Sequence, residues 1–195
     1  RMKIISIPDY GPMFRFNDAD VYWALHVLSD GRRMGRKRLA ELLGIGEGSV
    51  RKIVETLRDW DMISVHQTGI TITRSGLGFL AELPIKVVDI DLGDAVVGKH
   101  QQAVLVYGVG GKIENGMQQR DVGIRVGACG CTTVVMRDDV LLMPPDWNLD
   151  EERPDIADRI RSTTDMGPND AIIVGSGQDI HTAINAALMA AFQLF

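Results

Sequence analysis

Apolar residues recur at helical spacing in two neighbouring segments near the N-terminus. The first segment has an apolar face formed by Leu39, Ala40, Leu42 and Leu43, and Gly44 can end this helix in a left-handed cap. From Glu47 onward, a second apolar face is formed by Val50, Ile53, Val54, Leu57 and Trp60. The spacing predicts two short helices joined by a tight turn, with their polar residues facing outward.

The apolar pattern changes from helical to alternating after the second helix. Residues 62–65 and 70–73 alternate around a turn at residues 67–69, which predicts a β-hairpin. An earlier helix over residues 18–28 is predicted from the helical spacing of Val21, Trp23, Ala24, Val27 and Leu28. The front of the chain therefore contains the parts of a winged helix-turn-helix.

Beyond residue 83 the pattern predicts strands that alternate with helices. Leu83-Pro84 marks a domain boundary because proline blocks the continuation of a helix. Strands are predicted at residues 85–90, 103–109, 132–136, 140–143 and 171–174, and helices at residues 115–126, 154–161 and 179–194. This order predicts a helix-covered sheet of mixed strand direction.

The predicted fold is a two-domain α+β or α/β protein. The N-terminal winged helix-turn-helix takes residues 1–83, and a C-terminal mixed-sheet α/β domain for effector binding or dimerisation takes residues 84–195.

The composition is that of an ordinary globular protein. The apolar runs are too interrupted to span a bilayer, and the N-terminus lacks the pattern of a signal peptide. Cys129 and Cys131 are separated by one residue, a spacing that does not suit a disulfide. We therefore expect a cytoplasmic protein with no membrane partner.

The two halves differ in charge. Residues 1–83 contain 12 Lys or Arg against 10 Asp or Glu, a balance of +2, whereas residues 84–195 contain 9 against 16, a balance of −7. Five basic residues precede or begin the first helix of the helix-turn-helix, namely Arg32, Arg33, Arg36, Lys37 and Arg38. Such residues can contact phosphates, and binding that depends on them weakens with salt.

Several of these segments resemble the winged-helix family of prokaryotic transcription regulators, over roughly residues 14–83. The resemblance is carried by residues 39–45 (LAELLGI), 49–51 (SVR), 57–63 (LRDWDMI) and 71–76 (TITRSG). It implies that the second helix enters the major groove of DNA and that the hairpin wing contacts the adjacent backbone or minor groove.

The predicted DNA contacts lie on the outward face of these elements. Gly48 would let the backbone approach DNA closely, while Glu47 repels phosphate but can accept a hydrogen bond from a cytosine amino group. A solvated charged face or a protein-binding winged helix remains the alternative. The predicted DNA-binding residues are Arg36, Lys37, Arg38, Glu47, Gly48, Ser49, Arg51, Lys52, Thr56, Gln67 and Arg74.

Two glycine-rich segments in the second half are predicted as strand-to-helix turns, at residues 108–111 and 175–177. The backbone amides of such turns can hold an anion, although glycine also serves tight turns for steric reasons alone. Gln119 and Arg120 are the preferred contacts of a small anionic effector. The full set of predicted ligand-binding residues is Gly110, Gly111, Lys112, Gln119, Arg120, Asp121, Thr132, Thr133, Gly175, Ser176 and Gly177.

Part of this half resembles an uncharacterised archaeal family that joins a winged helix to a small α/β domain. The resemblance is carried by residues 110–113 (GGKI), 119–121 (QRD), 127–128 (GA) and 132–133 (TT), and it covers most of the chain. It supports the two-domain organisation.

Catalytic and metal-binding patterns are weak. The histidines lack ligand spacing, and a single cysteine pair is a poor zinc site. Ser176, His181 and Asp179 leave a catalytic triad open, but no nucleophile elbow accompanies them, and Asp179 more simply caps the terminal helix. We expect no catalytic residue, no metal and no cofactor.

The terminal helix is apolar around its whole circumference. One face is formed by Ile180, Ala183, Ile184, Ala187, Leu188, Ala191, Phe192 and Phe195, and the other side by Ala186, Met189 and Ala190. Such a helix must be buried, either across the sheet or between subunits. We therefore expect a homodimer through the C-terminal domain, which would present two winged helices to two DNA half-sites.

The sequence predicts a transcription regulator that binds double-stranded DNA and responds to a small anionic ligand. One alternative is an enzyme whose C-terminal domain binds a nucleotide or phosphate and whose winged helix is autoregulatory. Another is a winged helix that serves as a protein-interaction module.

Overall fold

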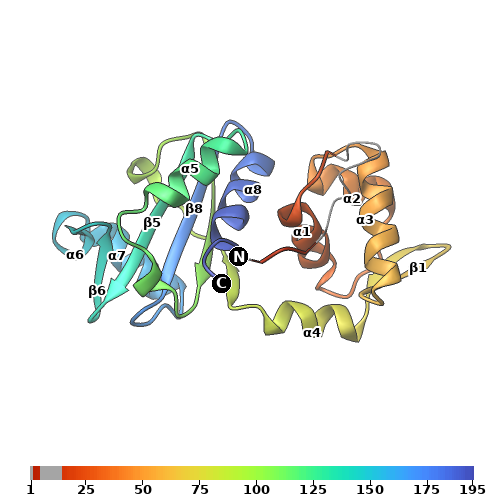
Figure 1. Ribbon diagram of the computed structural model, residues 1–195, viewed down its shortest axis with the longest axis horizontal. Coiled ribbons are helices and arrows are strands. Elements are labelled where there is room, and N and C mark those ends of the chain that lie inside the picture. The colour runs from red at the N-terminus through yellow and green to blue at the C-terminus, as the bar shows by residue number, and fades with distance from the viewer. Residues whose placement is uncertain (1, 5–14) are drawn as a thin grey trace. The chain divides into compact units, whose positions relative to one another are not determined.

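The computed structural model describes residues 2–4 and 15–195 (Figure 1). The chain forms two compact units, Lys3–Leu83 on the one hand and Pro84–Phe195 with Met2 on the other. Each unit has its own apolar core. The predicted first domain begins at Arg1, which, like residues 5–14, lies outside the described residues.

The first unit is a winged helix, as predicted. Asn17 caps its first helix by accepting hydrogen bonds from the amides of Ala19 and Asp20, and the Asp20 carboxylate accepts one from the Asn17 amide in return. Gly44 ends the second helix at φ 64°, which confirms the predicted left-handed cap. The elements are α1 (Asp18–Leu28), α2 (Arg36–Leu43), α3 (Glu47–Asp59), β1 (Ile63–His66), β2 (Gly69–Ile72) and α4 (Arg74–Glu82).

A residue from the segment before α2 pairs with the hairpin of this unit, beside its two strands. Ile63 pairs with Ile72 and His66 with Gly69 across the hairpin. On the other side of β2, the amide and carbonyl of Met34 exchange hydrogen bonds with those of Ile70, at 2.9 and 2.8 Å. The end of β2 next to the turn is therefore held by the segment before α2, and Ile63 and Ile70 of the hairpin are buried in the helical core.

The second unit is built on one sheet of six strands, in the order β3-β4-β8-β5-β6-β7. Its strands are β3 (Ile85–Val88), β4 (His100–Val106), β5 (Gly130–Arg137), β6 (Val140–Met143), β7 (Trp147–Asn148) and β8 (Ala171–Gly177). Its helices are η1 (Gly93–Ala95), η2 (Gly110–Lys112), α5 (Met117–Arg125), α6 (Leu149–Glu152), α7 (Pro154–Thr163) and α8 (Ile180–Ala191).

The predicted α/β domain is confirmed, but its strand directions need correction. Every strand pairing among the described residues is antiparallel, where a mixed sheet was expected. The connection from β4 to β5 passes through α5, and the two strands run in the same direction. They are not neighbours in the sheet, because one strand lies between them. This strand is β8, which runs antiparallel to both.

Helices cover both faces of the sheet (Figure 1). α5 and α8 pack side by side on one face, against β4, β5 and β8. On the other face, Leu149, Ile156 and Ile160 from α6 and α7 share a core with Val134 and Ile172. The central strand β8 is consequently buried along its whole length.

The segment Gly175-Ser176-Gly177, predicted as a turn, belongs instead to the central strand β8. A Cβ atom at Gly175 would lie 2.6 Å from the Ala187 nitrogen and still closer to the Ala183 carbonyl oxygen. The close approach of the α8 backbone to the strand thus requires glycine at this position. Tight turns also require glycine, so the two cases look alike in the sequence.

The terminal helix α8 is buried within a single chain. Ala186, Ala187 and Ala190 are fully buried, so both sides of the helix are covered. Its apolar circumference therefore does not by itself require a subunit interface, which removes that reason for expecting a dimer. None of the helices in the described part of the chain combines the length and the apolar character needed to cross a bilayer.

Replacing Gly175 with alanine should destabilise the second unit by about 1–3 kcal/mol, since the added methyl group must push α8 away from β8. Urea unfolding monitored by circular dichroism measures this change. The control is Gly111→Ala, because a Cβ atom there has its nearest neighbour at an ordinary 3.6 Å. Equal stability of the two variants would contradict the steric role of Gly175.

Candidate nucleic-acid interface and ligand cavities

The N-terminal ends of α2 and α3 enclose a cavity of about 250 Å³. It is lined by Arg36 and Lys37 from α2 and by Glu47, Val50 and Arg51 from α3. The four charged residues are exposed, and three of them are cations. The structure therefore brings together four of the predicted DNA-binding residues around a hollow with an excess of positive charge.

The start of α3 is open to the outside. Its N-cap is Gly46, which has no side chain to bond the following amides, and a Cβ atom added at Gly46 or Gly48 would have no other part of the chain within 4 Å. The N-terminus of a helix attracts anions through its amides and its dipole. The start of α3 therefore offers amides without a side-chain cap to an anion such as a phosphate.

The other predicted DNA-binding residues lie outside this cavity. Arg38 forms an exposed ion pair with Glu41 at 3.1 Å. Thr56 donates its hydroxyl to the Lys52 carbonyl at 2.9 Å, and both residues are half-buried, as is Ser49. Gln67 lies at the exposed turn of the wing, and Arg74 begins α4 on the surface.

The wing is tied to its surroundings at both ends. At the tip, Arg33 hydrogen-bonds the Thr68 hydroxyl. At the base, Thr73 donates its hydroxyl to the Asp61 carbonyl at 2.6 Å and accepts the Gly76 amide at 3.0 Å. The predicted site omitted Arg33, although the basic pair at residues 32–33 was the signal that could have identified it.

The predicted anion-binding turn at residues 108–111 is already occupied by the protein itself. The amides of Gly108 and Gly111 donate to the side chains of Asp170 and Asn169 at 2.8 and 2.9 Å, and the Gly110 amide donates to the Asn169 carbonyl. Lys112 donates from Nζ to the Leu194 carbonyl at 2.7 Å. These amides bind residues 169–170 of the same chain, so the prediction that they bind an anionic ligand is corrected.

Two of the three residues that left a triad open, Ser176 and Asp179, have structural roles. Ser176 is buried in β8 and donates to the Gly130 carbonyl at 3.5 Å. Asp179 accepts the amide and hydroxyl of Thr182 at 2.9 and 2.8 Å, which confirms that it caps α8 and lowers its pKa. Within residues 2–4 and 15–195, no cluster of His, Cys, Asp or Glu is placed to hold a metal ion.

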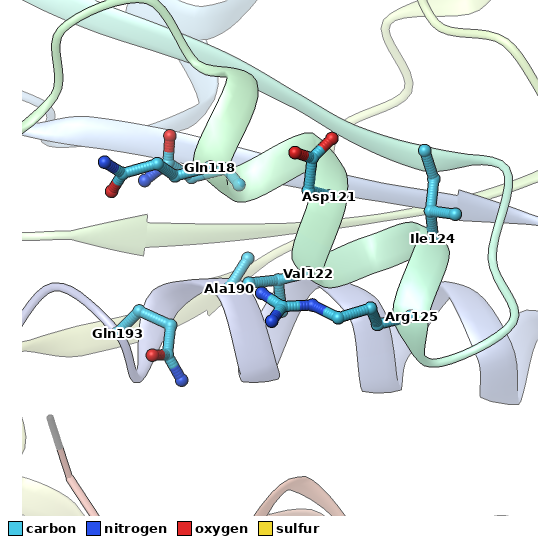
Figure 2. Close-up of a pocket in the computed structure, with 8 residues that line it drawn as sticks. Gln118, Asp121, Val122, Ile124, Arg125, Ala190 and Gln193 are labelled. Atoms are coloured by element: carbon cyan, nitrogen blue, oxygen red, sulfur yellow. The ribbon is translucent and has the colours of Figure 1, made fainter.

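The remaining predicted ligand-binding residues line two separate cavities beside α5. The larger, of about 620 Å³, lies between α5 and the end of α8 and includes Gln119 and Asp121 (Figure 2). The smaller, of about 240 Å³, includes Arg120, Thr132 and Thr133. The two preferred contacts, Gln119 and Arg120, thus line different cavities.

The smaller cavity also contains residues that the sequence did not single out, namely Asn115, Gly116, Met117, Cys131, Met143 and Pro144. The signals that could have found them were Asn-Gly at the start of a predicted helix and two prolines after a predicted strand.

Three comparisons place the chain among known proteins. A solved structure of a hypothetical protein from Pyrococcus horikoshii OT3 has a TM-score of 0.73 and 24% sequence identity, and the match covers 92% of this chain and 93% of that chain. This likeness shows a shared fold. No curated protein sequence matches this chain.

Both units match a known family model. Residues 20–86 match the CggR N-terminal DNA binding domain, in agreement with the winged helix described above. Residues 97–194, half of the chain, match the model described as a domain of unknown function, DUF4443. The chain therefore belongs to the DUF4443 family, with a winged helix joined to its small α/β domain.

Proposed function

We propose that this protein is a cytoplasmic, DNA-binding transcription regulator. The observation that carries the proposal is the open N-terminus of α3, around which Arg36, Lys37 and Arg51 gather. The match of residues 20–86 to a DNA-binding domain supports the same function.

The geometry of α3 suits the major groove of double-stranded DNA. The helix has 13 residues, a length of about 20 Å at 1.5 Å per residue. Arg51 and Glu47 project from its first turns, where a recognition helix reads base edges, and Glu47 can accept from a cytosine amino group. Arg36 and Lys37 contact the flanking phosphates in this arrangement.

The wing extends the contact beyond α3. Gln67 lies at its exposed turn, and Arg33 is held beside that turn by its bond to Thr68. Both side chains can reach the sugar-phosphate backbone next to the groove that α3 enters. The α/β domain has a charge of −7 from its 9 basic and 16 acidic residues, so DNA repels it and engages the winged helix alone.

We further propose that the α/β domain forms a homodimer and binds a small anionic effector. Met117 and Ile124 are half exposed, at 50% and 51%, and lie seven residues apart on one face of α5. Exposed apolar side chains of this kind favour association. A two-fold dimer would present two copies of α3 to two DNA half-sites.

The double substitution Arg51→Ala/Lys52→Ala should weaken DNA binding and its salt dependence. Fragments of the source genome are first selected on the purified protein at two salt concentrations, and binding to a recovered fragment is then measured by fluorescence anisotropy. Loss of the two positive charges from α3 should lower the slope of log K against log salt by up to about 2.

The matched control is Arg58→Ala, since Arg58 is exposed at the opposite end of the same helix. This variant should retain the affinity of the original protein. Failure to recover any fragment, or equal affinity of the double variant and the control, would point to a winged helix that binds protein instead of DNA.

Replacing Ile124 with aspartate should convert the dimer into monomers, because a carboxylate in an apolar interface loses its hydration. Light scattering of the purified chain should give the mass of two 21.4 kDa chains before the substitution and of one chain after it. Val97→Asp is the control, since Val97 is 79% exposed on a different segment of the same unit. A monomeric mass for the unsubstituted protein would rule out the dimer.

A further inference from the structure

The smaller cavity beside α5 has the features of a ligand site. It lies where the N-terminus of α5 meets the first half of β5, with the end of β6 and the following Pro144 on its other side. β6 pairs with β5 only from Val135 onward, so the cavity opens beside a stretch of β5 that β6 leaves uncovered. Its volume of about 240 Å³ suits a molecule of a few carbon atoms.

A buried hydroxyl group in this cavity lacks a partner. Thr133 is only 5% exposed, and its Oγ1 atom has no hydrogen-bond partner within the described chain. A Cβ atom built at Gly116 would lie 3.7 Å from both the Cβ and the Oγ1 atom of Thr133, so the hydroxyl lies beside the start of α5. Buried hydroxyl groups are almost always hydrogen-bonded, and an acceptor atom of a ligand in the cavity would complete this one.

The start of α5 adds partial positive charge at the same place. Gly116 is the N-cap, with φ 73° and no side chain to bond the amides of the first turn, and the Asn115 side chain accepts the Met117 amide at 3.0 Å. The amides and the dipole of the helix therefore favour an anion beside Thr133.

Arg120 supplies a full positive charge to the cavity. Its stem packs against Gly130, where a Cβ atom would lie 3.3 Å from the Arg120 Cγ. Its guanidinium bonds Asp121 at 3.0 and 3.1 Å, but both side chains are about half exposed, at 52% and 54%. Such exposed pairs contribute little, so Arg120 can exchange Asp121 for an anion in the cavity.

The remaining walls are uncharged. Met117, Met143 and Pro144 present apolar surface. Burial raises the pKa of the Cys131 thiol to about 12, so this wall carries no negative charge near neutral pH. Arg120 is the only charged side chain among the lining residues of the described chain, and one cation balances a single negative charge better than the two of a phosphate ester.

We propose that this cavity binds a small monocarboxylate with a short apolar body. The Thr133 hydroxyl donates to the carboxylate, the first turn of α5 and Arg120 balance its charge, and Met117, Met143 and Pro144 contact its hydrocarbon part. This inference rests on the proposed function in that it names the chemical class of the effector.

The test is a titration of the full-length protein, without DNA, followed by two-dimensional NMR of its amide signals. Butanoate is the probe, butanamide is its neutral counterpart of the same shape, and inorganic phosphate is the competing anion. Butanoate should shift the signals of Gly116, Met117 and Thr133 saturably, whereas butanamide and phosphate should not.

Three variants locate the binding. Thr133→Val removes the hydroxyl at constant shape, and Arg120→Gln removes the charge from a surface side chain. Each should weaken butanoate binding by about tenfold or more, the cost of one charge-assisted hydrogen bond. Arg125→Gln, on the same helix but lining the larger cavity, should bind as the original protein does.

Several results would overturn the proposal. These are the absence of shifts at these signals, phosphate or butanamide binding as tightly as butanoate, and unchanged affinity in Arg120→Gln. The last measurement decides the question even if Thr133→Val does not fold, because Arg120 is exposed. None of these results bears on DNA binding, which the Arg51 and Lys52 variant tests separately.

Discussion

The α/β domain depends on how closely the backbone of α8 approaches the central strand β8. Gly175 leaves no side chain between them, so the helix contacts the strand directly near Ala183 and Ala187. The small residues along α8 serve the same end, since Ala183, Ala187 and Ala191 are fully buried. This contact fixes α8 on the sheet, and α5 packs beside α8, which places both cavities described above.

The two units divide the chemistry of the protein between them. The winged helix gathers its cations at helix ends and a wing, on surfaces where a long anion can lie. The α/β domain carries the excess of acidic residues and contains cavities of about 620 and 240 Å³, the smaller of which is bordered by a buried hydroxyl. The proposed DNA and carboxylate ligands would thus meet different surfaces, with little competition between them.

The sequence predicted local features better than long-range ones. The Gly44 cap, the cap at Asp179 and the buried residues Val50, Ile53, Val54 and Leu57 of α3 follow from residues near one another in the chain, and all were predicted. Trp60, predicted on the same face, instead follows the end of the helix and is 42% exposed. The place of β8 between β4 and β5 depends on contacts between distant segments, which periodicity does not encode. Gly175 was misread because a turn and a close approach both require glycine, and Thr133 was selected without any sign that its hydroxyl lacks a partner.

The position of β8 also governs how the domain can assemble. Before β8 is added, β3 and β4 form one pair and β5, β6 and β7 form a separate group, and neither pairs with the other. During synthesis the winged helix leaves the ribosome complete, while the α/β domain waits as two unjoined halves with exposed strand edges. Completion of the sheet therefore depends on one late strand and on contacts between segments far apart in the sequence, which are slow to form.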